Sequence, residues 1–127
     1  MHYTKVVNIT YFWLHMETTR QKKVSRLLQK ELSSVFQKEI SSLLGNIMAT
    51  ITIVRISPDL ANANVFISFF PVKDPQVALK LIKDNSGMLR RHLGHRVKNQ
   101  LRIVPSIEYF LDDSAAYAEE IERLLKK

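Results

Sequence analysis

The 127-residue sequence contains no cysteine, and this absence removes several kinds of chemistry at once. Without thiols the chain has no disulfide, no thiolate nucleophile and no cysteine zinc site. The absence suits a reduced compartment, so we expect a cytoplasmic protein. The sequence also lacks a GxxxxGK[ST] loop, a GxGxxG turn and a GxSxG elbow. Enzymatic activity is therefore the weak hypothesis, and we predict neither a metal nor an organic cofactor.

Long hydrophobic runs are missing as well. The opening stretch MHYTKVVNITYFWLH is too short to span a bilayer and lacks the small-residue cleavage pattern of a signal peptide. An internal Met16 follows it, and then Thr18 and Gln21 stand at the spacing of a helix capping box. We predict that residues 1–15 are a nonfunctional extension and that residues 16–127 form one domain. An aromatic docking peptide in the first 15 residues is the less favoured alternative.

Charge is abundant and unevenly distributed. The chain has 19 lysines and arginines against 12 acidic residues, for a net charge of +7, which favours polyanionic partners. Residues 73–102 are strongly basic, whereas the acidic residues dominate after residue 106. The positive field should therefore be confined to one side of the molecule.

Apolar periodicity predicts a mixed α+β domain without repeats or linkers. Apolar residues at three- and four-residue steps indicate a long helix over residues 18–44, ended by Gly45-Asn46. Residues 50–57 and 63–70 are rich in β-branched and aromatic residues and should pair as an antiparallel hairpin. The turn between these strands explains Asp59 without a functional role.

The second half of the chain predicts two helices, a strand and a last helix. Asp74-Pro75 is a typical helix start, Ser86-Gly87 should break the helix, and a basic helix follows to about residue 98. Residues 101–111 read as a third strand, in which Pro105 should occupy a bulge or an edge. Asp112-Asp113 then caps a final helix, which explains this acidic pair better than acid–base catalysis does.

The helix break and the basic helix after it predict a nucleic-acid interface. The first amide groups of a helix are unpaired, the dipole there is positive, and a glycine lets a phosphate backbone approach closely. His92 and His95 share a helix face, but no cysteine or nearby carboxylate completes a metal site. The predicted RNA-binding residues are Asn85, Ser86, Gly87, Arg90, Arg91, His95, Arg96 and Lys98. A lateral extension on the first helix, for which a solvated face is the simpler interpretation, comprises Arg20, Lys23, Arg26 and Lys30.

Three segments carry a resemblance to a known family. They read KKVSRLLQKELSSVF, ITIVRISPDLANANVFISF and SGMLRRHLGHRVKNQLRIVPSIEYFLDDS. From Met16 to the C-terminus the chain resembles the bacterial ribosome-binding factor A family. The resemblance implies a type II KH-like fold, ordered helix, strand, strand, helix, kink, helix, strand. Members of that family have an Ala-x-Gly kink, which here reads Asn85-Ser86-Gly87.

The resemblance also implies a function. The family assists assembly of the small ribosomal subunit, contacts its ribosomal RNA and helps the 5′ region of that RNA mature, notably in the cold. We therefore expect a monomeric, non-enzymatic RNA-binding factor whose partners are the small ribosomal subunit and its precursor. The alternatives are a generic single-strand RNA-binding KH-like module and a protein–protein adaptor that uses the hydrophobic edge of the hairpin. The sequence does not specify which ribosomal RNA helices are contacted.

Overall fold

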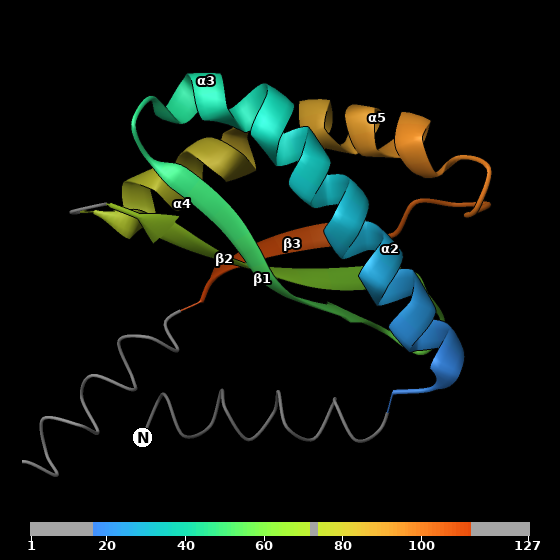
Figure 1. Cartoon of the computed structure of the whole chain (residues 1–127). Helices are drawn as coiled ribbons and strands as arrows, with labels where there is room; N and C mark the ends of the chain where they lie inside the picture. The colour runs from blue at the N-terminus through green and yellow to red at the C-terminus, as the bar shows by residue number, and fades with distance from the viewer. Residues whose placement is uncertain (1–16, 72–73, 113–127) are drawn as a thin grey trace, which may run out of the picture.

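The computed structural model of the chain describes residues 17–71 and 74–112 as a layer of helices over one face of a three-stranded sheet (Figure 1). The first helix, α2, spans Thr19–Val35 and has Thr18 as its N-cap. The amide of Gln21 donates to Thr18 Oγ1 at 3.1 Å, and the amide of Thr18 donates to Gln21 Oε1 at 2.9 Å. The predicted capping box is therefore confirmed.

The long first helix contains one wide turn before it ends. A π-helical segment, η1 (Phe36–Ile40), follows α2, and a short helix, α3 (Ser41–Leu44), follows η1. The wider turn keeps Phe36, Ile40 and Leu44 on the buried side, in line with the apolar stripe of α2. The helix ends at Gly45, whose φ of +67° favours glycine, as the sequence predicted.

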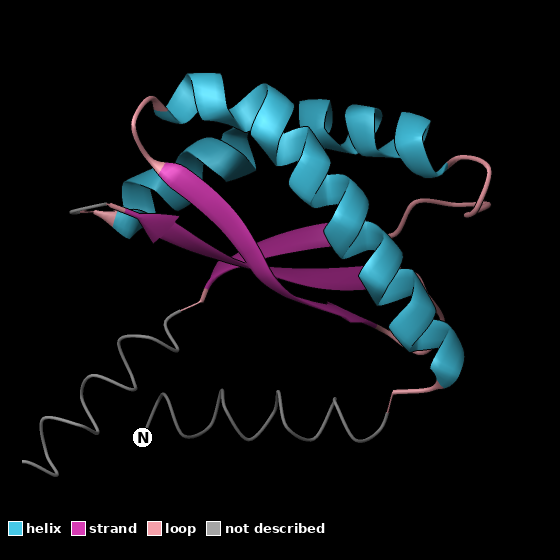
Figure 2. Cartoon of the chain, viewed as in Figure 1, coloured by secondary structure: helices cyan, strands magenta, loops and turns pink. Residues whose placement is uncertain are grey.

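The sheet has the strand order β1-β2-β3, with β1 at Met48–Ile56, β2 at Asn62–Phe70 and β3 at Ser106–Leu111 (Figure 2). Strands β1 and β2 are antiparallel, which confirms the predicted hairpin, whereas β2 and β3 are parallel. In the hairpin turn Asp59 Oδ1 accepts hydrogen bonds from the Ser57 hydroxyl and the Ala61 amide. These bonds confirm the structural interpretation of Asp59.

The third strand is shorter than the sequence predicted. It begins at Ser106, and residues 101–105 form an irregular segment. Pro105 is buried immediately before the strand and has no N–H for a ladder, so neither a bulge nor an edge position within the strand applies to it. The irregularity of the sheet lies instead in β1, between Ile51 and Ile53.

One hydrophobic core fills the space between the helices and the sheet. Alternate residues of β2 point into it, and two further helices cover it: α4 (Pro75–Asp84) and α5 (Ser86–Val97). On the opposite sheet face Phe66 and Phe110 stack, with ring centroids 5.4 Å apart. The predicted N-terminal extension and C-terminal helix lie outside the described residues. Within residues 17–71 and 74–112 no helix is long and apolar enough to cross a membrane.

Candidate nucleic-acid interface

The junction between α4 and α5 lies at Asn85, one residue before the predicted break. Asn85 has φ −104° and ψ 16°, and α5 already begins at Ser86. The Asn85 side-chain amide donates to the Leu81 carbonyl at 2.8 Å, and its backbone amide donates to Ile82 at 3.1 Å. The asparagine therefore satisfies a carbonyl at the end of α4, which an alanine side chain cannot do.

Gly87 does not break the helix, contrary to the prediction, and it is not needed for an unusual backbone conformation. It is the second residue of α5, and its φ lies outside the left-handed range. A Cβ atom added at Gly87 would meet no other atom within 4 Å. What the glycine provides is a bare backbone surface at the start of a helix, where a ligand can approach closely.

A shallow groove separates the α4–α5 junction from β3. It consists of two hollows of about 270 and 300 Å³, and both are lined by Ser86, Ile107 and Tyr109. Burial raises the pKa of the Tyr109 phenol, so this side chain stays neutral in the groove floor. We call this feature the β3 groove; its other lining residues are Lys83, Gly87, Arg90, Ser106, Glu108 and Phe110.

Arg90 at the groove has a structural contact that the sequence did not reveal. Its Nη1 atom donates to the carbonyl of Pro105 and its Nη2 atom to the carbonyl of Val104, each at 2.7 Å. The guanidinium therefore fastens α5 to the segment before β3. It also remains exposed, so its positive charge still contributes to the groove.

The other predicted binding residues of the basic helix, Arg91, His95, Arg96 and Lys98, fall on two sides of it. Arg96 pairs with Glu31 of α2 at 3.3 Å, and both side chains are largely shielded from solvent. Arg91, His95 and Lys98 are exposed and point away from the core. Among the predicted cations, Arg96 therefore holds the fold, Arg90 both holds the fold and contributes charge to the groove, and Arg91 and Lys98 present their charge to solvent.

The predicted lateral extension lies on the neighbouring helix. Helices α2 and α5 pack side by side over the sheet (Figure 1). The four α2 residues are all exposed: Arg20, Lys23, Arg26 and Lys30. The structure thus brings both predicted groups of cations into one helical layer.

Sequence reasoning missed the wall of the groove that β3 provides. Ser106, Ile107, Glu108 and Phe110 line it, together with Lys83 at the end of α4. Alternation in the SIEYFL segment indicates a strand but does not reveal which helix junction the strand faces. The described part of the chain contains no cluster of histidine and acidic side chains able to hold a metal ion.

The chain is similar in sequence to proteins named ribosome-binding factor A. The profile of the family "Ribosome-binding factor A" matches residues 20–125. The protein of that name from Cytophaga hutchinsonii is 43% identical over 112 residues, covering 88% of this chain and 84% of the relative. The one from Flavobacterium johnsoniae is 37% identical over 111 residues, covering 87% and 85%.

Solved structures show the same fold. The crystal structure of ribosome-binding factor A from Thermus thermophilus matches with a TM-score of 0.59 at 22% identity, covering 72% of this chain and 94% of that one. A homology model of the Thermus protein, fitted into a cryo-electron-microscopy map of a complex with 30S, matches with a TM-score of 0.56 at 23% identity, covering 68% and 89%. The α+β, KH-like fold expected from the sequence is therefore confirmed. The chain belongs to the ribosome-binding factor A family.

Proposed function

We propose that this protein is an assembly factor that binds the small ribosomal subunit and its precursor through ribosomal RNA. The β3 groove is the observation that carries the proposal, because a bare helix start at Gly87 meets two cations there, Lys83 and Arg90. The first amides of a helix attract phosphate oxygens. The exposed cations of α5 and α2 extend this attraction across the helical layer. No catalytic step is required for binding of this kind, and the cytoplasm is its site of action.

Backbone contacts define what such a surface recognises. Phosphate contacts fix position and orientation but carry no base sequence. The groove wall combines an apolar side chain, Ile107, with the hydroxyl of Ser106, which is suited to a sugar–phosphate strand lying beside β3. The carboxylate of Glu108 opposes phosphate, but the lining also holds two positive charges, on Lys83 and Arg90. We therefore expect a monomer to recognise the shape of folded ribosomal RNA.

The proposed role in the cold follows from kinetics. Misfolded RNA helices are traps whose escape slows on cooling, and a protein that binds one arrangement more tightly shifts the population toward it. We therefore propose that the protein favours a processing-competent arrangement of the 5′ region of the small-subunit RNA.

The adaptor alternative has less support. Its binding surface was the free edge of the hairpin, which is β1. The carbonyl of Ile56 accepts a hydrogen bond from Gln21 at 2.9 Å, and Gln29 donates to the carbonyls of Ile51 and Thr52 at 3.3 and 3.4 Å. Because side chains of α2 occupy these carbonyls, β1 is a poor template for another strand.

A deletion strain tests the proposal. Cells without the protein should grow poorly in the cold and accumulate small-subunit particles with unprocessed ribosomal RNA. The wild-type gene should restore growth, and a double variant, Arg91→Gln with Lys98→Gln, should restore it poorly because it removes two exposed charges. The charge-matched control, Thr50→Glu with Ser42→Glu, alters exposed residues of β1 and α3 and should rescue fully. Normal subunit profiles in the deletion strain at low temperature would contradict the proposal.

A further inference from the structure

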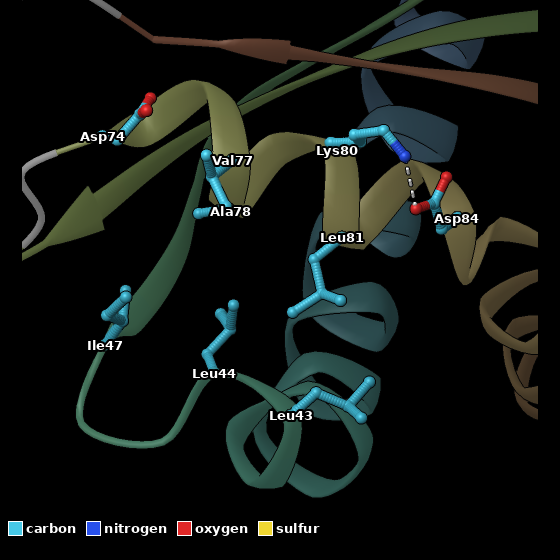
Figure 3. Close-up of a pocket in the computed structure, with 9 residues that line it drawn as sticks. All are labelled: Leu43, Leu44, Ile47, Asp74, Val77, Ala78, Lys80, Leu81 and Asp84. Carbon is cyan, nitrogen blue, oxygen red and sulfur yellow. Dashed lines mark hydrogen bonds and ion pairs between the residues drawn. The ribbon is translucent and has the colours of Figure 1, made fainter.

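A further hollow differs from the two hollows of the β3 groove, because most of its lining residues are apolar. It has a volume of about 510 Å³ and opens between α3, the start of β1 and α4 (Figure 3). We call it the α3–α4 pocket. Its apolar lining residues are Leu43, Leu44, Ile47, Val77, Ala78 and Leu81.

The chain reversal after α3 creates this pocket. Gly45 turns the chain away from α3 into β1, and the side chains of Leu44 and Leu81 then face each other across an open space (Figure 3). Leu44 is buried at the base, whereas Leu43 is 45% exposed and Val77 is 64% exposed. Exposed aliphatic side chains beside a hollow are typical of a surface that accepts an apolar group from another molecule.

The charges around the pocket differ in sign from the protein as a whole. Asp74 and Asp84 lie at opposite ends of it (Figure 3), and Lys80 is its one cation among the described lining residues. Lys80 Nζ lies 3.0 Å from Asp84 Oδ2, so that pair is neutral as a unit. The described lining residues therefore carry a net charge of −1 on a chain whose net charge is +7.

These features disfavour RNA as the occupant. Carboxylates repel phosphates, and none of the described residues that line the pocket is aromatic, so it offers no platform on which a base could stack. A small molecule is also disfavoured, because the polar groups lie at the ends and do not converge on the apolar interior. An apolar side chain flanked by lysine or arginine matches both the lining and the sign of the charge.

We infer that the α3–α4 pocket receives an apolar side chain of a cationic protein segment on the small ribosomal subunit. The inference rests on the proposed function, because the subunit is where the partner is expected. The two surfaces then divide the work: the β3 groove binds ribosomal RNA, and the α3–α4 pocket adds a protein contact. Such a contact lets the factor distinguish an assembled particle from free RNA of similar shape.

Binding measurements with purified 30S subunits and with protein-free small-subunit ribosomal RNA separate the two surfaces. The test variant is Val77→Asp, which adds a carboxylate at an exposed pocket residue. Ile103→Asp is the matched control, because Ile103 is an equally apolar residue with 75% exposure that does not line the pocket. A photo-crosslinking amino acid at position 77 identifies the contacted molecule and residue by mass spectrometry.

The expected result is that Val77→Asp weakens binding to 30S subunits roughly tenfold and leaves the affinity for protein-free RNA unchanged. The crosslink from position 77 should reach a protein segment in which lysine or arginine flanks an apolar residue. A crosslink to RNA, a crosslink to an acidic segment, no crosslink, or equal 30S affinity of Val77→Asp and wild type would overturn the inference. If the wild-type protein binds neither 30S subunits nor ribosomal RNA, the proposed function itself fails, which is a distinguishable outcome.

Discussion

Replacing Arg90 should lower stability, whereas replacing its neighbour Arg91 should not. Arg90 donates to two backbone carbonyls at 2.7 Å and fastens α5 to the segment before β3. Arg91 is exposed and points away from the core. The two side chains carry the same charge, so the comparison isolates the hydrogen bonds.

The expected loss of stability in Arg90→Ala follows from the two hydrogen bonds that the arginine makes. A hydrogen bond from a charged donor contributes about 1.5–3 kcal/mol. Arg90 is exposed, and water can replace part of both contacts, so we expect Arg90→Ala to cost about 2 kcal/mol in total. Arg91→Ala should stay within about 0.5 kcal/mol of the wild type.

Urea denaturation followed by circular dichroism measures both variants. With a slope of about 2 kcal/mol/M, a loss of about 2 kcal/mol lowers the midpoint by roughly 1 M. Arg90→Lys keeps the charge but loses the planar fork that reaches both carbonyls, and it should fall between Arg90→Ala and the wild type. Equal midpoints for Arg90→Ala and Arg91→Ala would refute the reasoning.

Further predictions concern binding, stability and local conformation. If about five phosphates are contacted, log affinity for RNA should fall against log salt with a slope of roughly −3.5 to −4.5; a flat dependence would argue against backbone contacts. Gly94→Ala should stabilise the protein by up to about 1 kcal/mol in thermal unfolding, since the added Cβ makes an ordinary 3.7 Å contact, whereas Gly87→Val should leave the protein folded and weaken RNA binding. The hydrogen bond from the Ser57 hydroxyl, and next the one from the Ala61 amide, hold the pKa of Asp59 below its ordinary value near 3.8. NMR titration should therefore show that the Asp59 carboxyl stays ionised to a lower pH than a free aspartate does. The stabilisation from these bonds should be lost as the pH falls through the lowered pKa. Deletion of residues 1–15 should leave the melting temperature and RNA affinity unchanged, and a large fall in either would show that the segment belongs to the domain.

Local signals in the sequence predicted the helices of the described residues and the hairpin well. The capping residues Thr18 and Gln21, the ending glycine at residue 45 and the Asp74-Pro75 start all act within one turn of the chain. Each of these features depends only on neighbouring residues, so the spacing of residue types suffices to recognise it. The break between α4 and α5 was misplaced by one residue because the Asn85 side chain, not the glycine, ends α4.

Contacts between residues far apart in the chain could not be predicted from the sequence. The parallel pairing of β3 with β2, and with it the β3 groove, depends on how the chain returns after α5. The pairings of Arg90 with the Val104 and Pro105 carbonyls and of Arg96 with Glu31 likewise join residues well separated in the chain. A basic run therefore predicts the sign of a surface, but it does not separate cations that hold the fold from cations available to RNA.

Crosslinking from the β3 groove tests the central claim most directly. Ser86 is exposed at the start of α5 and lines both hollows of the groove. A photoreactive amino acid at position 86, irradiated in the complex with purified 30S subunits, should crosslink to small-subunit ribosomal RNA at a defined site. Excess unlabelled wild-type protein should suppress that crosslink. Crosslinks that reach only ribosomal proteins, or that persist unchanged with competitor, would contradict binding of ribosomal RNA through this groove.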